Sequence, residues 1–248
     1  MKQIPSLLFL GLLFFGTSLI AQTSSKPNYS LQVGGQFRFL NPVGLNHAID
    51  QFNLSHPSWT DELETIGWTQ GLSFAAGIHR GRSEIRFQVQ TFGASGFGIG
   101  PDSLGISERL DTRLSGVTYQ VALASNLVEI NRNLTFGIGG AFSMNQITLR
   151  SAFVPESEFN ADAELPETQT FLKPSLNLIA PINIGLGPWV NLKIEPTYQV
   201  FFAPSNYSDF SQAINGSLLS VNDPALETEA DHFGITVSLV AFFRRKYK

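Results

Sequence analysis

Histidines next to carboxylates are the residues of this chain whose types could support catalysis. Asp231 directly precedes His232, and a histidine held beside a carboxylate can act as a general base toward water or a serine hydroxyl. Polar segments contain many such neighbours through composition alone, so the pair has little specificity. We therefore expect a protein without catalytic residues, and a hydrolase built on Asp231 and His232 is the alternative.

A metal or cofactor site is not expected either. The spacing of His47 and His56, which precede Asp61 and Glu62, matches no set of zinc ligands. The acidic segments 150–169 and 203–231 lack the spacing of an EF-hand calcium loop. The chain contains no cysteine, which excludes a disulfide scaffold and a lipid-anchored lipoprotein. His79, at the end of a predicted strand, is expected to be structural.

The elements that position these side chains are predicted to be strands. In residues 71–93, apolar side chains alternate with small or polar ones on both sides of the turn 80–82. Period-2 alternation around a short glycine-containing turn is typical of a β-hairpin. The same alternation predicts eight strands, at residues 29–40, 72–79, 83–93, 112–124, 134–145, 170–184, 189–202 and 232–243. Strands of about ten residues are long enough to cross a bilayer when tilted.

Long and short connections alternate between these strands, as in outer-membrane barrels. The short ones are predicted at 80–82, 125–133 and 185–188, and the long ones at 41–71, 95–111, 150–169 and 203–231. Apolar residues at helical spacing in 44–53, followed by Pro57, predict one short helix in the first long connection. The other three long connections are predicted to be loops.

The polar face of the strands consists mostly of Gly, Ala, Ser, Thr, Asn and Gln. Its charge is confined to Arg38, Glu84, Arg86, Lys173, Lys193 and Glu195. A soluble, lipocalin-like barrel would instead have an apolar interior and a more charged outer face. We therefore predict an all-β fold, an eight-stranded antiparallel up-and-down transmembrane β-barrel, with the polar face lining a narrow lumen.

Charges inside a narrow lumen must pair, because an unpaired buried charge is very costly. Glu84 and Arg86 follow one short turn, and Lys193 and Glu195 follow another, so these four are predicted to meet across the bore. Arg38 and Lys173 are expected nearer the outer end. This set is a structural charge cluster and not a catalytic site.

Two prolines mark a predicted weak point in the wall. Proline cannot donate a ladder hydrogen bond, yet Pro174 and Pro196 fall inside predicted paired strands. A turn about residues 185–186 would place Pro174 nearly opposite Pro196 or Thr197. The seam between these strands would then carry either a β-bulge or a lateral gap through which a hydrophobic ligand could reach the lumen.

The N-terminus reads as a secretory signal peptide. Lys2 precedes the apolar run 7–15, and cleavage is predicted after Ala21. The predicted organisation is thus a signal peptide at 1–21, a short segment at 22–28 and a barrel domain at 29–248. Charged residues make up 15% of the chain and its net charge is −4, which argues against nucleic-acid binding.

Several stretches resemble a known family. The signal peptide ending at Ala21, the stretches GLNHAIDQFN and FLKPSLNLIAPINIG, and the aromatic-ended last strand are similar to small outer-membrane β-barrel proteins of Bacteroidetes, which share the architecture of the OmpA transmembrane domain and OmpX. The resemblance implies a monomer in the outer membrane of a Gram-negative cell, in contact with lipid, assembled by periplasmic chaperones and the barrel-assembly machinery. Phe243 or Tyr247 would be the terminal aromatic that this machinery reads.

The function expected from these observations is structural, or is interaction with a partner at the cell surface through four extracellular loops. No enzyme activity and no cofactor are predicted. Two alternatives besides the hydrolase remain: a narrow channel past Arg38, Arg86, Lys193 and Glu195, and a transporter of hydrophobic ligands.

Overall fold

The computed structural model describes residues 28–40, 42–131, 133–158, 165–216, 223–228 and 232–244. Its elements are β1 (Asn28–Phe39), α2 (Val43–Ser55), β2 (Trp68–Arg80), β3 (Ser83–Pro101), β4 (Ser107–Asn131), β5 (Leu134–Pro155), η1 (Glu156–Glu158), β6 (Glu167–Ile179), β7 (Ile182–Gly185), β8 (Val190–Phe201), β9 (Ser205–Asn206), α3 (Ser208–Asn215), η3 (Pro224–Leu226), β10 (Glu227–Thr228) and β11 (His232–Arg244). The predicted signal peptide, Asp231 and Tyr247 lie outside the described residues.

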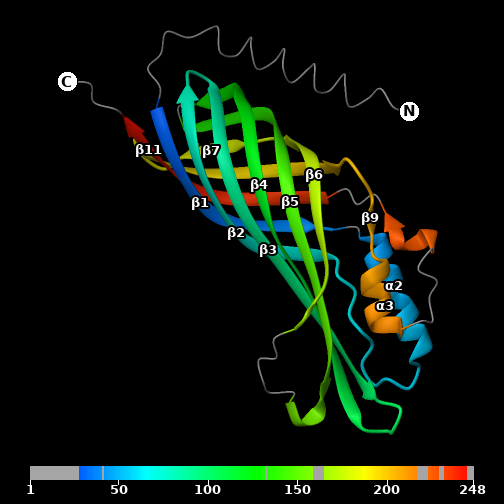
Figure 1. Ribbon diagram of the computed structural model, residues 1–248. Coiled ribbons are helices and arrows are strands. Elements are labelled where there is room, and N and C mark those ends of the chain that lie inside the picture. The colour runs from blue at the N-terminus through cyan, green and yellow to red at the C-terminus, as the bar shows by residue number, and fades with distance from the viewer. Residues whose placement is uncertain are drawn as a thin grey trace.

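The main sheet closes into a barrel (Figure 1). Hydrogen-bonded neighbours follow the order β11, β1, β2, β3, β4, β5, β6 and β8, and β8 pairs back onto β11. Every pair is antiparallel, and β7 continues the line of β6 with the same register against β5 and β8. Counting β6 and β7 as one interrupted strand gives eight positions around the ring. The predicted eight-stranded up-and-down barrel is confirmed.

The wall of the barrel is apolar outside and polar inside. On β1, Leu31 is 56% exposed and Val33 is 51% exposed, whereas Gln32 between them is only 7% exposed. The same alternation runs along β2 and β3, where Phe74 and Phe87 are exposed. This is the predicted arrangement, and it excludes a soluble barrel with an apolar interior.

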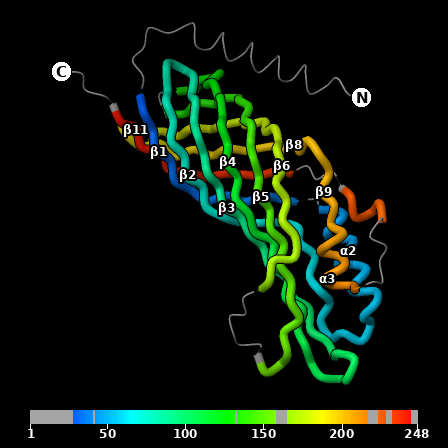
Figure 2. Tube along the Cα trace, viewed as in Figure 1, coloured from blue at the N-terminus to red at the C-terminus, as the bar shows by residue number. Residues whose placement is uncertain are grey.

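Three strands are much longer than the sequence predicted. β3, β4 and β5 run on past the barrel, and β3 and β4 form a hairpin that turns only at residues 102–106 (Figures 1 and 2). The predicted loop 95–111 is therefore mostly strand, as is the start of the predicted loop 150–169. The predicted lower connection 125–133 is strand up to Asn131. Glycines in 96–100 obscured the pattern, because glycine is depleted in strands.

The sixth predicted strand, residues 170–184, is interrupted. Pro181 separates β6 from β7, since proline has no N–H to donate to a neighbouring strand. The carbonyl of Pro181 still accepts from the N–H of Gly137 on β5 at 2.8 Å, so the line of the strand is preserved.

The prediction that Pro174 lies nearly opposite Pro196 is wrong. The β7–β8 register pairs Gly185 with Asn191, which places the turn farther along the chain than predicted. The N–H of Phe202 donates to the carbonyl of Pro174 at 3.2 Å, and that of Ala180 donates to the carbonyl of Pro196 at 3.0 Å. The two prolines therefore stand at opposite ends of the β6–β8 ladder.

Both prolines nevertheless remove a backbone donor from the same seam. In an antiparallel ladder, the N–H and C=O of one residue point toward the same neighbouring strand. The missing donors of Pro174 and Pro196 thus both face the β6–β8 seam. Between them β6 and β8 share only five register pairs, from Ser175 with Phe201 to Ile179 with Thr197.

Two helices lie beside the extended strands, at the end of the barrel opposite the described chain ends (Figure 1). α2 confirms the predicted helix at 44–53 and extends it by a residue or two at each end. α3 falls in the predicted loop 203–231 and was not predicted. None of the described helices is long and apolar enough to span a membrane.

Hydrogen exchange measures the strength of the seam. In detergent, amides of residues 172–176 and 194–198 should exchange at least about tenfold faster than those of residues 134–142, which corresponds to ~1.4 kcal/mol in opening free energy. The reason is that each proline removes one ladder bond from this seam. Equal protection of all three segments would show that the seam is sound and would exclude a lateral route for a hydrophobic ligand.

Candidate functional site: the filled lumen and its cap

The outer wall has the surface of a membrane-spanning barrel. Its exposed apolar band is flanked at one end by Tyr29 and Phe243, which are register partners, and at the other by Phe39, Trp68 and Phe233. The Phe39 and Phe233 rings stack, with centroids 6.3 Å apart. An apolar band with aromatic edges around a polar interior characterises outer-membrane barrels, whose long connections are extracellular. The protein is an outer-membrane β-barrel, and its helices lie at the extracellular end.

A hydrophobic core closes that end. Leu45, Ile49 and Phe52 repeat at helical spacing on α2 and are fully buried, as is Phe210 on α3. The other members of this core are Ala48, Trp59, Leu63, Ile66, Phe92, Leu110, Leu114, Leu149, Tyr207, Ile214 and Leu226. We call α2, residues 56–67, residues 203–216 and residues 223–228 the cap. The cap packs onto side chains of β3, β4 and β5 at the mouth of the lumen.

Two asparagines fasten α2 to the segment that follows it. Asn53 accepts from the N–H of Leu63 at 2.8 Å and donates to its carbonyl at 3.0 Å. Asn46, two turns earlier, makes the same pair of bonds with Ile66 at 3.1 and 3.4 Å. Each side-chain amide thus replaces a backbone partner, so residues 56–67 are held without forming a strand.

Polar contacts also join α2 to the last part of the cap. His47 Nε2 lies 3.2 Å from Asp223 Oδ2, and Asn215 on α3 donates to the carbonyl of Ala48 at 3.0 Å. The N–H of Ala225 and the His47 ring hold the pKa of Asp223 below its ordinary value. Burial raises the pKa of Tyr207 in the same region.

A glycine stripe on β3 makes room for the cap. Gly96, Gly98 and Gly100 alternate on the inner face of the extended strand. A Cβ added at Gly100 would overlap the Trp59 indole, and one at Gly98 would lie 2.8 Å from the backbone nitrogen of Leu63. The stripe falls in the predicted loop 95–111, and it is the docking surface for residues 56–67.

The lower lumen holds a balanced charge cluster. Lys193 Nζ lies 2.7 Å from Glu84 Oε2 and 3.6 Å from Glu195 Oε2. Arg86 forms an ion pair with Glu195 and lies 3.5 Å from Glu84 Oε2. All four residues are buried, and they come from strands β3 and β8, which are not neighbours in the sheet. The predicted pairing across the bore is present.

Side-chain amides fill the lumen above this cluster. Asn145 accepts from Thr118 at 2.8 Å and from Gln199 at 3.0 Å, and donates to Ser175 at 2.9 Å. Asn177 donates to Ser143 and Gln120 in the same way. Neutral hydrogen bonds thus connect strands across the middle of the bore.

The two remaining predicted cations lie near the extracellular end, as expected. Arg38 donates to Gln90 at 2.7 Å, to Thr118 at 2.9 Å and to Gln36 at 3.2 Å. Lys173 donates to the backbone carbonyls of residues 203 and 204. All of these hydrogen-bond acceptors are uncharged, so the upper lumen differs from the balanced cluster below.

On the extracellular side of Pro174, β6 is no longer joined to the chain after β8 by a backbone ladder. Contacts made by β6 side chains with residues 203–207 take its place. Gln169 donates to the carbonyl of Asn206 at 2.8 Å, and the Phe171 and Tyr207 rings meet edge to face at 5.4 Å. Together with Lys173 these residues alternate along β6, so one face of the strand anchors the start of α3.

The histidines do not form a catalytic arrangement in the described part of the chain. His232 begins β11, but its side chain is buried in the lumen against Phe201, with ring centroids 5.0 Å apart, and is not exposed at the rim. Near the periplasmic end, Ser30 Oγ lies 2.9 Å and Glu84 Oε1 3.8 Å from the same nitrogen of His79. A catalytic triad needs serine and carboxylate on opposite ring nitrogens.

His56 stacks on Phe52 at 4.2 Å and does not approach His47, which contacts Asp223. Asp61 and Glu62 are exposed. Among the described residues, no group of three or more histidine, aspartate or glutamate side chains is placed to hold a metal ion.

Two parts of the cap were not predicted from the sequence. α3 carries Phe210 and Ile214 at helical spacing, which is a sequence signal for a helix. This short signal was overlooked inside the long predicted loop 203–231. The docking role of the glycine stripe had no local signal, because it depends on residues 56–67 folding back onto β3.

Breaking the charge cluster should destabilise the barrel. Glu84→Gln removes the closest carboxylate from Lys193 and should lower the free energy of unfolding by about 3–5 kcal/mol, because a buried cation loses its partner. Urea unfolding in detergent measures this. Glu129→Gln, an exposed carboxylate on β4, is the matched control and should stay within about 0.5 kcal/mol of wild type. Adding Lys193→Met to Glu84→Gln should restore part of the loss, and an unchanged midpoint for Glu84→Gln would refute the idea.

Filling the glycine stripe should loosen the cap. Gly100→Ala should displace Trp59 and cost about 1–3 kcal/mol in cap stability, because the added methyl overlaps the indole. Limited proteolysis within residues 56–67 reports the displacement. Gly67→Ala is the control, since a Cβ there meets no atom within 4 Å. Equal proteolysis of the two variants would show that the stripe does not hold the cap.

Comparisons with known proteins reveal similar folds. No protein-family model and no curated protein matches the sequence. Among solved structures, Neisserial surface protein A has 10% identity and a TM-score of 0.45, with 87% of this chain and 97% of that chain covered. Ail of Yersinia pestis, in complex with sucrose octasulfate, has 9% identity and a TM-score of 0.43, with 88% and 99% covered. OprG from Pseudomonas aeruginosa has 10% identity and a TM-score of 0.40, with 89% and 99% covered. The fold assignment for this chain rests on its own strand pairing.

Proposed function

We propose that this outer-membrane barrel is a non-enzymatic, non-conducting anchor that presents its cap to a positively charged extracellular partner. The observation that carries this proposal is the hydrophobic core between the cap and strands β3, β4 and β5. A core of this kind gives the extracellular face a defined shape, and a defined shape is what a binding surface requires.

The filling of the lumen argues against a channel. The charge cluster of Glu84, Arg86, Lys193 and Glu195 spans the bore. Higher up, a chain of hydrogen bonds crosses it from Arg38 through Thr118 and Asn145 to Gln199. The cap core then covers the mouth with apolar side chains. An ion moving along the axis would have to displace each of these layers in turn.

The charge of the cap indicates the chemistry of its partner. The cap segments 42–67, 203–216 and 223–228 contain no lysine or arginine. Exposed carboxylates on this surface are Asp50, Asp61, Glu62, Glu64, Asp209 and Glu227. A surface whose charges have one sign attracts and orients a partner whose charges have the opposite sign.

Conductance tests the closed lumen. Purified protein in planar bilayers should show no stable conductance steps, because the lumen layers and the cap block the axis. The conductance of the double variant Phe52→Ala, Phe210→Ala is the companion measurement. This variant removes the cap core and should leave the lumen layers intact, so it tests those layers alone. Regular steps from the wild-type protein would favour the narrow channel over the proposed anchor.

Binding to a basic ligand tests the surface. An arginine-rich peptide should bind cells displaying the protein, and the triple variant Asp50→Asn, Glu62→Gln, Glu64→Gln should bind about tenfold more weakly, since three exposed charge pairs contribute ~0.2–1 kcal/mol each. Glu129→Gln, at the periplasmic end, is the charge-matched control. Equal binding by the triple variant, or binding unaffected by raised salt, would contradict a charge-based surface.

A further inference from the structure

Arg38 is a buried cation of the lumen with no carboxylate among its contacts in the described part of the chain. It is 7% exposed, and its hydrogen bonds go to the neutral side chains of Gln36, Gln90 and Thr118. Its guanidinium also lies over the Phe92 ring, 4.5 Å from the centroid. A guanidinium has five N–H donors, and these contacts use three of them.

The lumen carboxylates do not balance this charge. Glu84 and Glu195 are both engaged by Arg86 and Lys193 in the cluster nearer the periplasmic end. The second cation of the upper lumen, Lys173, interacts electrostatically with Glu227 of the cap, so the charge without a carboxylate partner is that of Arg38. A buried charge without a counterion is costly, so the upper lumen favours an additional negative charge.

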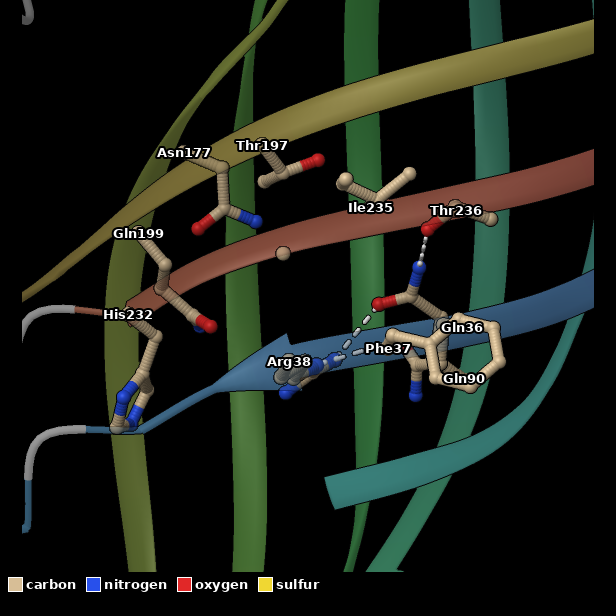
Figure 3. A pocket seen from close by; sticks show the side chains of 11 residues that line it. Gln36, Phe37, Arg38, Gln90, Asn177, Thr197, Gln199, His232, Ile235 and Thr236 are labelled. Carbon is tan, nitrogen blue, oxygen red and sulfur yellow. Dashed lines mark hydrogen bonds between the residues drawn. The ribbon is translucent and has the colours of Figure 1, made fainter. Parts of the chain in front are cut away.

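A small cavity lies beside Arg38 (Figure 3). Its volume is about 20 Å³, and its lining includes Gln36, Gln90, Gln199, His232 and Thr236. Room for one water molecule requires about 10–15 Å³ on this measure. The cavity therefore has room for a single water or a monatomic ion.

Polar side chains from several strands line this space, and Figure 3 labels Gln36, Gln90, Gln199 and Thr236 among them. The amide nitrogens of the three glutamines donate elsewhere: Gln36 to the carbonyl of Thr91, Gln90 to Thr236, and Gln199 to Asn145 and Ser175. The bonds of Arg38 come from its Nε and Nη2 atoms, so the two N–H groups on Nη1 are left for an anion, as is the hydroxyl hydrogen of Thr236. An anion there would meet one full positive charge and these donors.

We propose that this cavity binds one monovalent, monatomic anion, with chloride as the natural occupant, as the counterion of Arg38. The anion would link Arg38 on β1 with Thr236 on β11 directly beneath the cap. The site is independent of the partner-binding function proposed above, since its lining residues come from the barrel strands and not from the cap.

Halide-dependent stability tests the proposal. Wild-type protein in detergent is unfolded in urea at constant ionic strength, with sodium gluconate replaced stepwise by sodium chloride. The urea midpoint should rise and saturate, as for a ligand bound only by the folded state. The variant Arg38→Gln should lose the rise, Arg38→Lys should keep part of it, and the exposed-cation control Arg113→Gln should behave as wild type.

Bromide provides a readout that does not depend on the stability of any variant. Crystals of the wild-type protein grown in sodium bromide should give an anomalous peak beside the Arg38 guanidinium. Bromide peaks confined to the surface, an adventitious ion only, would overturn the proposal, as would a midpoint that is the same in chloride and gluconate. Heat-modifiable gel mobility confirms that each variant is folded before its midpoint is compared.

Discussion

Closure of the sheet imposes the constraint on which the rest of this structure depends. A barrel in lipid must satisfy its backbone hydrogen bonds internally, and the pairing of β8 with β11 completes the ring. Eight strands leave a bore that side chains can fill. Everything placed inside that bore must then satisfy its own charges and hydrogen bonds, because little water is available to do so.

The contents of the lumen follow from this constraint in layers. Nearest the periplasm, Glu84 and Glu195 offset Arg86 and Lys193, so two charges of each sign are buried together. Amides and hydroxyls occupy the middle, where Asn145 and Asn177 bond to side chains on other strands. Arg38 ends the polar stretch, and its guanidinium lies against Phe92, a member of the hydrophobic core that closes the extracellular end. The interior thus changes from ionic to neutral to apolar along one axis.

The cap likewise depends on how the space on the inner face of the barrel strands is filled. β3, β4 and β5 continue beyond the membrane band, and their inner face turns apolar or loses its side chains altogether. Gly98 and Gly100 admit the backbone and indole of residues 56–67, and α2 and α3 cover the mouth. Where the β6–β8 ladder stops at Pro174, side chains of β6 hold the chain leading into α3. An interruption of the wall and the attachment of the cap therefore occur at one place.

Sequence periodicity alone determined the barrel, because the two-residue repeat of a strand directly records which side chains face lipid and which face the lumen. It also determined that Glu84, Arg86, Lys193 and Glu195 share the inner face, and that residues 44–53 are helical. Tertiary structure decided what depends on distant partners. The register of the β7–β8 hairpin moved Pro174 away from Pro196, since a turn shifted by a few residues displaces every pair in the ladder. The glycine stripe became a docking surface only because residues 56–67 fold back onto it. Local patterns carry no record of such long-range contacts, whose geometry exists only once the ring has closed.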